Sequence, residues 1–388
     1  MPTPQGPHTP QGAHTSQGPH KQPRAARAPR TPRETAGPKR ATVQEVAAAA
    51  GVSTATVSRV LNGNYPVAAE TRRKVEQAVR SLGYVVNAHA RALAGSRTRT
   101  VGIIVDDIID PFYTLVARGV QQQAAEDGKL CLVCSTYGVV GGEVDLIDAL
   151  HEQRADAVIV VGGGASDPAH RRKLADRARA LNREGSWLVL CGRPPLEPGV
   201  PAGIVDYDNT GGAHAITEYL LGLGHRRILY VGGPEHLSAH QARVAGFRRA
   251  HASRGLEVDE RLIQPGAFSR RFGYERTAQL LRDGSAGEFT AVFGANDAVA
   301  VGVLQALREA GLRVPQDVSV VGYDDIPLAA EVTPALTTVH LPLEQMGREA
   351  VRLAVALRGE SDSPTDPRHV GTHVVIRDST APPPAPPT

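Results

Sequence analysis

The sequence has few cysteines, few aromatic residues and no long apolar run. Three cysteines among 388 residues exclude a fold held together by disulfides. No apolar segment approaches the roughly 20 residues that cross a bilayer, and the N-terminus lacks the apolar core of a secretory signal. We therefore expect a cytoplasmic protein with no membrane partner. With 41% hydrophobic residues, the chain is long enough for several domains with cores of their own.

Acidic charge is scarce in the first hundred residues. Residues 1–40 carry seven Lys and Arg against one acidic residue, and residues 41–99 carry eight against three. Since the formal net charge of the whole chain is only +3, a basic front precedes an acidic body. Such a front points to a polyanion as partner, with nucleic acid as the first candidate. The alternative is a solvated basic surface without a partner.

Residues 1–40 also lack the aliphatic side chains that form a core. Three copies of a six-residue unit, TPQGPH, TPQGAH and TSQGPH, occupy residues 3–20, and a stretch rich in Pro, Arg and Ala follows. This composition predicts a disordered tail over 1–40, and the proline-rich residues 381–388 predict a second one. The evenly spaced histidines leave a metal-binding tract open as an alternative, but we predict neither a metal nor a cofactor.

Helix-forming residues begin at Ala41. Thr42 and Glu45 have the spacing of a capping box, in which the hydroxyl accepts from a backbone N–H and the glutamate reaches back. The pattern predicts a helix that runs to about Ala50 and ends in a turn at Gly51.

A second helix follows this glycine turn. Ser53 is its predicted cap, and Val57 and Val60 recur at the spacing that packs against the first helix. A third helix, from about Ala69 to Leu82, would close the bundle with Leu82 pointing inward. Two short helices joined by a glycine turn are typical of a helix-turn-helix, although a helical hairpin without a DNA partner shares the pattern.

After Thr100, apolar runs alternate with amphipathic stretches. The runs are VGIIV, LCLVCS, AVIVV, WLVLC, RILYV, TAVFG and VSVVGY. This alternation predicts an α/β fold with parallel sheets that helices cover on both faces. Ligands of such sheets bind beyond the carboxyl ends of the strands. In the loop after VGIIV, Asp110 is placed to cap a helix, and Phe112 and Tyr113 project where the helix begins.

The order and spacing of several motifs resemble one family closely. The motifs include ATVQEVAAAAGVSTATVSRVLNG, TRTVGIIVDDIIDPFY, LLGLGHRRILYVGGP, RVPQDVSVVGYDDIP and TPALTTVHLPLEQMG. Over residues 41 to about 380, the chain resembles the lactose/galactose repressor (LacI/GalR) family. The resemblance implies a helix-turn-helix headpiece and a periplasmic-binding-protein-like body of two subdomains. It also implies a homodimer that binds a palindromic operator in double-stranded DNA.

The resemblance assigns roles within the headpiece. Thr54 and Ala55 face base edges first, and because both are small, much of the direct reading should fall to neighbours such as Arg59. The remaining outward residues of this helix are expected to hold phosphates, which position the headpiece without specifying sequence. They are Ser53, Thr56, Ser58 and Asn62.

The segment Asn87 to Gly95 matches the family's hinge helix, which lies in the minor groove. Leu93 is the expected wedge between base steps, and Ala90 is small enough for the partner's hinge to approach. Asn87 and Arg91 are further expected DNA contacts. Leu93 as an interdomain packing residue is the alternative.

The resemblance also implies a small-molecule pocket in the body. Arg243 matches the family's pocket arginine, and Ser238 and His240 are expected at the rim. An arginine and an aspartate opposed across an apolar cleft with aromatic walls would suit a sugar, or a nucleoside-like effector. The candidate ligand-binding residues are Asp110, Phe112, Tyr113, Arg243, Phe268, Asn296 and Asp324. Each has a structural alternative, as a cap, a packing residue or a structural ion pair.

These observations divide the chain into segments. The tail 1–40 precedes a DNA-binding domain over 41–86 and a hinge helix with linker over 87–99. An N-terminal sensor subdomain comprises 100–205 with 341–369, and a C-terminal one comprises 206–340 with 370–380. Ligand closure of the cleft would change the affinity for the operator.

Other classes of protein fit less well. Cys131 and Cys134 read CxxC, but a spacing of three within a strand puts them on opposite faces, which argues against a redox role. No nucleophile, base and orienting group occur at a catalytic spacing, so we predict no enzyme. A solute-binding protein without a regulatory role is the alternative, and the headpiece argues against it. The sequence predicts a ligand-responsive transcriptional regulator, a repressor in the first instance.

Overall fold

The structure of the protein is a computed structural model, which describes residues 41–62, 65–84, 99–139, 141–164, 167–284, 287–358 and 366–384. The predicted tail 1–40 lies outside the described residues, and so do residues 385–388 of the predicted tail 381–388. The predicted hinge contacts Asn87, Ala90, Arg91 and Leu93 lie outside them as well. The start of the second tail is ordered, contrary to the prediction, since Ala381 N donates to Ser319 Oγ at 3.0 Å. The chain divides into two compact units, Met1–Val85 and Val86–Thr388, and each is described by itself.

The first unit holds three helices around a small apolar core. They are α1 (Val43–Ala50), α2 (Thr54–Asn62) and α3 (Ala69–Ser81). The predicted capping box is present, since Glu45 N donates to Thr42 Oγ1 at 3.3 Å and Thr42 N donates to Glu45 Oε2 at 2.7 Å. Gly51 takes the left-handed conformation that ends α1, with φ at 67°. Val57 and Val60 are buried as predicted.

One prediction for this unit is wrong. Leu82 was expected to point inward, but its side chain is 40% exposed. The reason is that α3 ends at Ser81 and the chain turns left-handed at Gly83, so position 82 leaves the face that packs Val75 and Ala78.

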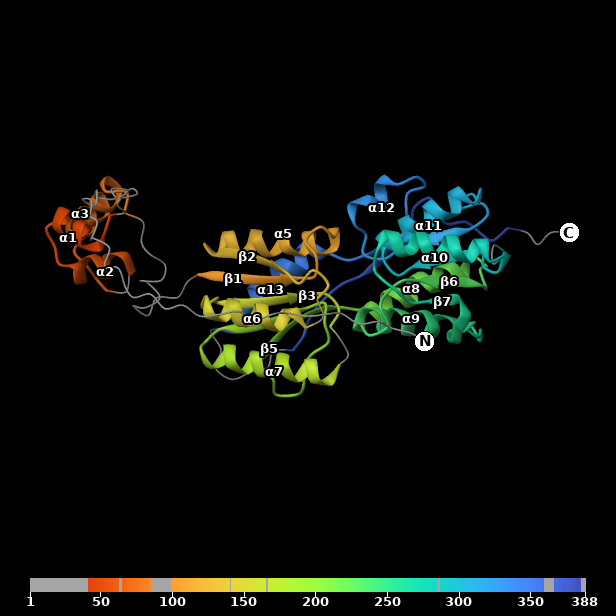
Figure 1. Cartoon of the computed structure of the whole chain (residues 1–388), viewed down its shortest axis with the longest axis horizontal. Helices are drawn as coiled ribbons and strands as arrows, with labels where there is room; N and C mark the ends of the chain where they lie inside the picture. Colours follow the sequence, from red (N-terminus) through yellow and green to blue (C-terminus); the bar gives the residue numbers. More distant parts are fainter. Residues whose placement is uncertain are drawn as a thin grey trace, which may run out of the picture. The chain divides into compact units, whose positions relative to one another are not determined.

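The second unit contains two subdomains, each built on a parallel sheet (Figure 1). The larger sheet has the order β11-β5-β4-β3-β1-β2, and every pairing in it is parallel. Its strands are β1 (Thr100–Val105), β2 (Leu130–Ser135), β3 (Ala157–Val161), β4 (Trp187–Cys191), β5 (Ala202–Tyr207) and β11 (Arg368–Val370). The helices around it are α5 (Pro111–Glu126), α6 (Gly142–Glu152), α7 (Pro168–Arg183) and α13 (Leu343–Ala356).

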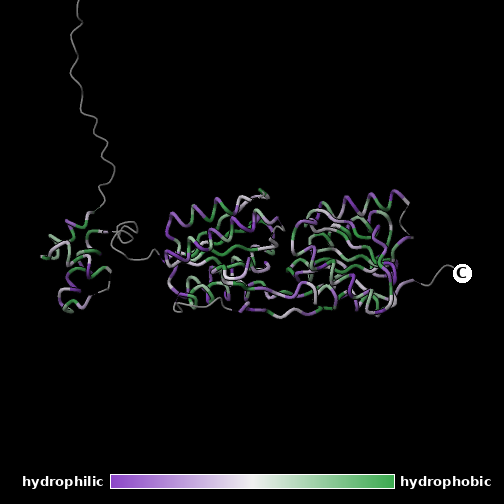
Figure 2. Tube along the Cα trace, turned by 90° about the horizontal axis from the view of Figure 1, so that it is seen from below, coloured by the Kyte–Doolittle hydropathy of each residue, from purple (hydrophilic) through white to green (hydrophobic). Residues whose placement is uncertain are grey.

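Both faces of this sheet are buried. Side chains on one strand alternate, so Ile103 packs in the core that includes α5 and α13, whereas Ile104 packs in the core that includes α6 and α7. Figure 2 shows the hydrophobic residues gathered inside each subdomain. Two glycines allow α5 and α13 to cross closely, since a Cβ at Gly119 would lie 2.0 Å from Glu344 O and one at Gly347 2.1 Å from Val116 O.

The smaller parallel sheet has the order β7-β6-β8-β9. Its strands are β6 (Ile228–Val231), β7 (Ile263–Gln264), β8 (Ala291–Gly294) and β9 (Ser319–Val321). A short antiparallel pair joins β10 (Thr338–His340) to β12 (His373–Val375). The helices are α8 (Asn209–Gly222), α9 (Ser238–Ser253), the 3₁₀ turn η1 (Glu260–Leu262), α10 (Arg270–Arg282), α11 (Asp297–Glu309) and α12 (Pro327–Glu331).

The chain passes between the two sheets after β5, after β10, and between β11 and β12. All seven predicted apolar runs form strands, and the prediction of an α/β fold with parallel sheets covered on both faces is confirmed. Strand β5 was not among those runs, because Gly203 and Asp206 interrupt its apolar character.

Candidate functional site

The exposed face of α2 carries the predicted DNA contacts. Ser53 caps the helix, since Thr56 N donates to Ser53 Oγ at 3.2 Å, and the hydroxyls of Ser53 and Thr56 lie 3.0 Å apart. Thr54, Ala55 and Arg59 are exposed, whereas Thr56 and Ser58 are half-buried. Thr54, Ala55, Ser58 and Arg59 thus lie on the side of α2 away from the buried Val57 and Val60. The side chain of Asn62 lies outside the described part of the chain.

Arg59 has a neighbour that the sequence did not reveal. Its guanidinium lies 5.6 Å from the centre of the Tyr65 ring, a cation–π arrangement that restricts the orientation of the arginine. Tyr65 is exposed beyond the end of α2. A tyrosine in a loop gives no periodic signal, so only the tertiary structure pairs it with the helix.

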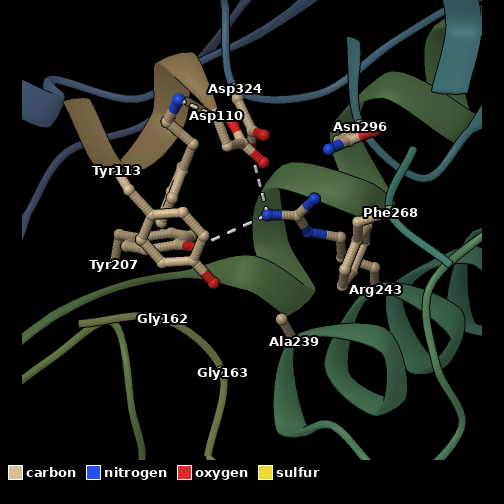
Figure 3. A pocket seen from close by; sticks show the side chains of 11 residues that line it. Asp110, Tyr113, Gly162, Gly163, Tyr207, Ala239, Arg243, Phe268, Asn296 and Asp324 are labelled. Atoms are coloured by element: carbon tan, nitrogen blue, oxygen red, sulfur yellow. Dashed lines mark hydrogen bonds and ion pairs between the residues drawn. The ribbon is translucent and has the colours of Figure 1, made fainter. Parts of the chain in front are cut away.

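The body contains a cavity where the two subdomains meet, which measures about 370 Å³ with its open mouth included (Figure 3). Its walls come from the loops that follow β1, β3, β7, β8 and β9, from the end of β5, and from α9. These are carboxyl ends of parallel strands, where ligands of such folds bind. All seven predicted ligand residues line it, with four more: Asp110, Phe112, Tyr113, Gly162, Gly163, Tyr207, Ala239, Arg243, Phe268, Asn296 and Asp324.

The N-terminal subdomain contributes the corner at the start of α5. Asp110 caps the helix as predicted, since its Oδ1 accepts from Phe112 N at 2.9 Å and Pro111 takes the first helical position. Phe112 and Tyr113 meet edge to face with ring centres 5.1 Å apart. Burial raises the pKa of Asp110, although the hydrogen bond from Phe112 acts to lower it. Asp110 therefore both caps the helix and faces the cavity.

The C-terminal subdomain contributes a buried ion pair. Arg243 Nη2 donates to Asp324 Oδ1 at 3.0 Å, and Arg243 Nε donates to Asn209 Oδ1 at 2.9 Å. Its third nitrogen donates to the carbonyl of Ala295. Burial disfavours the charge of Arg243, but Asp324 and nearby tyrosines raise the pKa of the guanidinium overall. A charged, fully oriented arginine therefore forms one wall of the cavity.

Aromatic rings enclose the same guanidinium. Its central carbon lies 3.8 Å from the centre of the Tyr323 ring and 5.6 Å from that of Phe268. Cation–π contacts of this kind strengthen when the cation is desolvated. Phe268 also lines the cavity, so it holds the arginine and offers an apolar surface at once.

Asp324 is held in a conformation that costs energy. Its φ is 105°, a value that L-residues rarely adopt, and Asp325 follows with φ at 57°. Buried Asp297 fixes this segment, because it accepts from Ile326 N at 2.9 Å while its own N–H donates to Tyr323 O at 2.8 Å. Burial raises the pKa of Asp324 to about 7, although Arg243 acts to lower it.

Asn296 has a structural role besides its place in the wall. Its Oδ1 accepts from Val299 N at 2.9 Å and so caps α11. The amide nitrogen makes no such capping bond, and the side chain lines the cavity. The two roles are compatible, since a cap uses only the oxygen.

Two details of the predicted pocket are wrong. Arg243 and Asp324 were expected to oppose each other across the cleft, but both belong to the C-terminal subdomain and are in direct contact. His240 was expected at the rim, but it is buried, with Nδ1 3.2 Å from Gly232 O and its ring against Tyr230. In the sequence of α9, His240 lies between the wall residues Ala239 and Arg243, but its side chain falls on the face of the helix that packs against the core.

Four wall residues escaped the sequence reasoning. Gly162 and Gly163 follow β3 in a triple glycine that reads as an ordinary turn, although a Cβ at Gly162 would lie 2.7 Å from the Tyr113 hydroxyl. Tyr207 ends a strand that was not predicted, and Ala239 is a small helical residue without a distinctive pattern. The Gly162 position could have been suspected from the glycine run alone.

The two cysteines of β2 lie in surroundings that disfavour redox chemistry. The side chains of Cys131 and Cys134 pack with different cores, on opposite sides of the sheet as predicted. Burial raises the pKa of both thiols, which disfavours the reactive thiolate. Within the described ranges, no three His, Cys, Asp or Glu side chains are grouped as metal ligands. No helix among those residues is long and apolar enough to cross a membrane.

Comparisons with known proteins agree with this architecture. Residues 42–87 match the family described as bacterial regulatory proteins, lacI family, and residues 217–380 match a periplasmic binding protein-like domain. The HTH-type transcriptional regulator CelR of Thermobifida fusca is 36% identical over 352 residues, which cover 88% of this chain and 98% of CelR. The ribose operon repressor of Escherichia coli K12 is 33% identical, over 81% of this chain and 92% of the repressor.

Two solved structures are similar over most of the chain. A complex of the transcriptional regulator CelR with cellobiose is 36% identical, with a TM-score of 0.63, and covers 88% of this chain and 100% of that one. The Lac repressor dimer bound to operator and the anti-inducer ONPF is 26% identical, with a TM-score of 0.76 and the same coverage.

A helix-turn-helix headpiece joined to a two-subdomain body with a cavity between the subdomains defines a ligand-controlled transcriptional regulator, not an enzyme. The chain belongs to the LacI/GalR family, as its motifs predicted. Like the family, it binds operator DNA, and a small-molecule effector controls that binding.

Proposed function

We propose that this regulator is a repressor whose operator affinity is set by a sugar bound in the cavity around Arg243 and Asp324. The observation that carries the proposal is the buried Arg243–Asp324 pair, which lies between aromatic rings where the subdomains meet. A guanidinium presents a fixed fork of donors and a carboxylate two acceptors, a set that matches neighbouring hydroxyl groups. Relatives that were solved with cellobiose or that regulate a ribose operon support a sugar.

The other wall residues divide by chemistry. Asp110 and Asn296 offer polar atoms from opposite subdomains, and Phe112, Tyr113 and Phe268 offer apolar surface for the ring carbons. An effector that touches both subdomains stabilises the arrangement in which they are closed together. Differential affinity of this kind is what couples the effector to the operator.

The DNA side of the proposal uses the headpiece and the segment after it. Thr54, Ala55 and Arg59 read bases in the major groove, and Ser53, Thr56, Ser58 and Asn62 hold phosphates. The hinge over 87–99 enters the minor groove with Leu93 as the wedge, beside Asn87, Ala90 and Arg91. The boundaries 41–86, 100–205 with 341–369 and 206–340 with 370–380 separate the DNA-binding and sensing parts. Since its target is chromosomal DNA, the protein acts in the cytoplasm, at the nucleoid.

A DNA-binding titration tests the proposal. The full chain is titrated against DNA from upstream of its own gene, with and without a panel of mono- and disaccharides and nucleosides. At least one sugar is expected to change the operator dissociation constant by about fivefold or more, a typical coupling. The effect should vanish in Arg243→Lys, because an ammonium cannot replace the fork of donors. A response to nucleosides alone, or to no compound, would contradict a sugar effector.

A further inference from the structure

We infer that Tyr65 helps to set the operator specificity of the headpiece, because it holds Arg59 in the orientation that reads a base pair. This inference rests on the proposed role of Arg59 as a base-reading residue and adds a positioning residue to it. Tyr65 acts on the DNA through the arginine and reads no base itself.

The Tyr65 ring is placed where it adds little to the stability of the fold. Its side chain is 63% exposed, whereas Tyr84, the other tyrosine of the first unit, packs against the apolar core. Burial of apolar surface is the main contribution of an aromatic ring to folding. The interaction that the structure shows for the Tyr65 ring is instead its contact with Arg59, whose guanidinium carbon lies 5.6 Å from the ring centre.

The chain between α2 and α3 keeps this ring in place. Leu61, near the end of α2, and Val67, just before α3, both pack against the core of the unit. Tyr65 lies between these two anchors, and Pro66 directly after it disfavours a helical backbone at Tyr65. Since Arg59 lies in the last turn of α2, the ring is held beside the end of the helix from which the arginine projects.

An aromatic partner orients the arginine and leaves its hydrogen-bond donors free. A cation–π contact attracts the charge of the guanidinium to the ring and requires none of its five N–H donors. A carboxylate partner would occupy two of them through parallel N–H···O bonds. Among the residues that the structure describes, Arg59 forms no ion pair. Its donors therefore remain available for the O6 and N7 acceptors of a guanine, the commonest specific contact of arginine in the major groove.

The orientation of Arg59 matters because the other base-reading positions carry small side chains. Thr54 and Ala55 offer a hydroxyl and a methyl group but no bidentate set of donors. Discrimination among base pairs therefore depends largely on one long, exposed arginine. Such a side chain loses conformational entropy when it binds a base, and a partner that orders it beforehand reduces this loss. Tyr65 is thus expected to affect both the operator affinity and the preference at the base pair that Arg59 reads.

A double-mutant cycle tests the inference with the full-length protein. The protein first selects its operator from a library of random double-stranded DNA, and fluorescence anisotropy then compares this operator with its single-base variants. Tyr65→Leu is expected to weaken operator binding about threefold to tenfold, the effect of ordering one long side chain. It should also relax the preference at the base pair that Arg59 reads. In an Arg59→Ala background, Tyr65→Leu should change the operator affinity less than about twofold, because the arginine through which Tyr65 acts is absent.

Two further variants separate orientation of the arginine from direct contact with DNA. Tyr65→Phe keeps the ring and loses the hydroxyl, so it should retain both the affinity and the base preference. Leu82→Ala removes another exposed apolar side chain of the same unit and should change neither quantity. Thermal unfolding of each variant checks that the headpiece stays folded.

The outcomes distinguish this inference from the proposed function. If Tyr65→Leu has no effect, acts equally on all sequences, or acts as strongly in the Arg59→Ala background, Tyr65 does not position the arginine. If Tyr65→Phe loses as much affinity as Tyr65→Leu, the hydroxyl contacts the DNA itself, and the inference is again wrong. The base-reading role of Arg59 would stand in each of these cases. If Arg59→Ala leaves the base preference unchanged, that proposed role fails, and this inference fails with it.

Discussion

Arg243 Nη2 lies 3.0 Å from Asp324 Oδ1, and the two side chains are only 3% and 5% exposed. They come from α9 and from the loop after β9, and both face the cavity. Two charges that neutralise each other offer many hydrogen-bonding atoms without net charge, which favours an uncharged polar ligand. The two charges lose their water when the protein folds, so ligand binding does not carry the free-energy cost of desolvating or orienting them.

Loss of one partner should therefore be costly. In Arg243→Met, the free energy of unfolding should fall by about 3–5 kcal/mol, because Asp324 is left buried and unpaired. The effector response should be lost at the same time. Chemical denaturation measures the first effect and a titration against operator DNA the second. Arg248→Met on the same helix breaks an exposed pair with Glu260 and should cost less than about 1 kcal/mol. Equal costs for the two variants would contradict the assignment.

Stability should depend on pH through Asp324. Its pKa rises from 3.8 to about 7 on folding, mainly through burial. The folded state thus holds this proton more tightly than the unfolded state does. Protonated Asp324 therefore stabilises the fold fully below about pH 4, and this stabilisation is lost as the pH rises to 7. Between pH 5 and 7, the free energy of unfolding should fall by up to about 2 kcal/mol more in the unaltered protein than in Asp324→Asn. Denaturant titrations at several pH values measure the free energy of unfolding. If it falls equally with pH in the two proteins, the prediction is wrong.

Arg59 should carry much of the base reading. Its replacement by alanine is expected to weaken operator binding by about 1–3 kcal/mol and to relax sequence preference at one base pair of each half-site. Binding to a library of operator variants measures both effects. Arg73→Ala, an exposed arginine of α3, serves as the control for charge alone. A uniform loss across all sequences would show a phosphate contact in place of a base contact.

Leu93 should act at the centre of the operator. Leu93→Ala removes the expected wedge, so operator affinity should drop by more than threefold and the DNA should bend less. Fluorescence anisotropy measures the affinity and energy transfer between labelled DNA ends measures the bend. If the operator affinity changes by less than about threefold, which corresponds to a binding free energy change below roughly 1 kcal/mol, Leu93 is a packing residue and not a wedge.

The homodimer should use the edge of the larger sheet. Strand β2 is the outer strand next to β1, and exposed apolar side chains gather on it and just after it, at Leu130, Val133, Tyr137 and Val139. An apolar edge of this kind is normally covered. Leu130→Asp should weaken the dimer at least tenfold in analytical ultracentrifugation, whereas Ile376→Asp, at another exposed apolar position, should not. A dimer that tolerates Leu130→Asp would place the interface elsewhere.

Local patterns carried much of the fold and part of the site. The capping box of Thr42 and Glu45, the cap at Asp110 and the strands of the two sheets depend on neighbours in the chain, so the sequence predicts them. Leu82 was misplaced because a left-handed glycine one residue later redirects the chain. His240 was misplaced because one helical step separates the core face from the cavity wall.

The periodicity of the sequence determined the α/β architecture. The resemblance of its motifs to one family determined the family and implied the pocket residues Arg243, Phe268, Asn296 and Asp324. Only the tertiary structure decided that Arg243 contacts Asp324 within one subdomain, that Tyr65 lies under Arg59, and that Tyr207 lines the cavity. Those relationships join residues far apart in the chain. Their distances depend on how whole elements pack, which no local pattern in the sequence records.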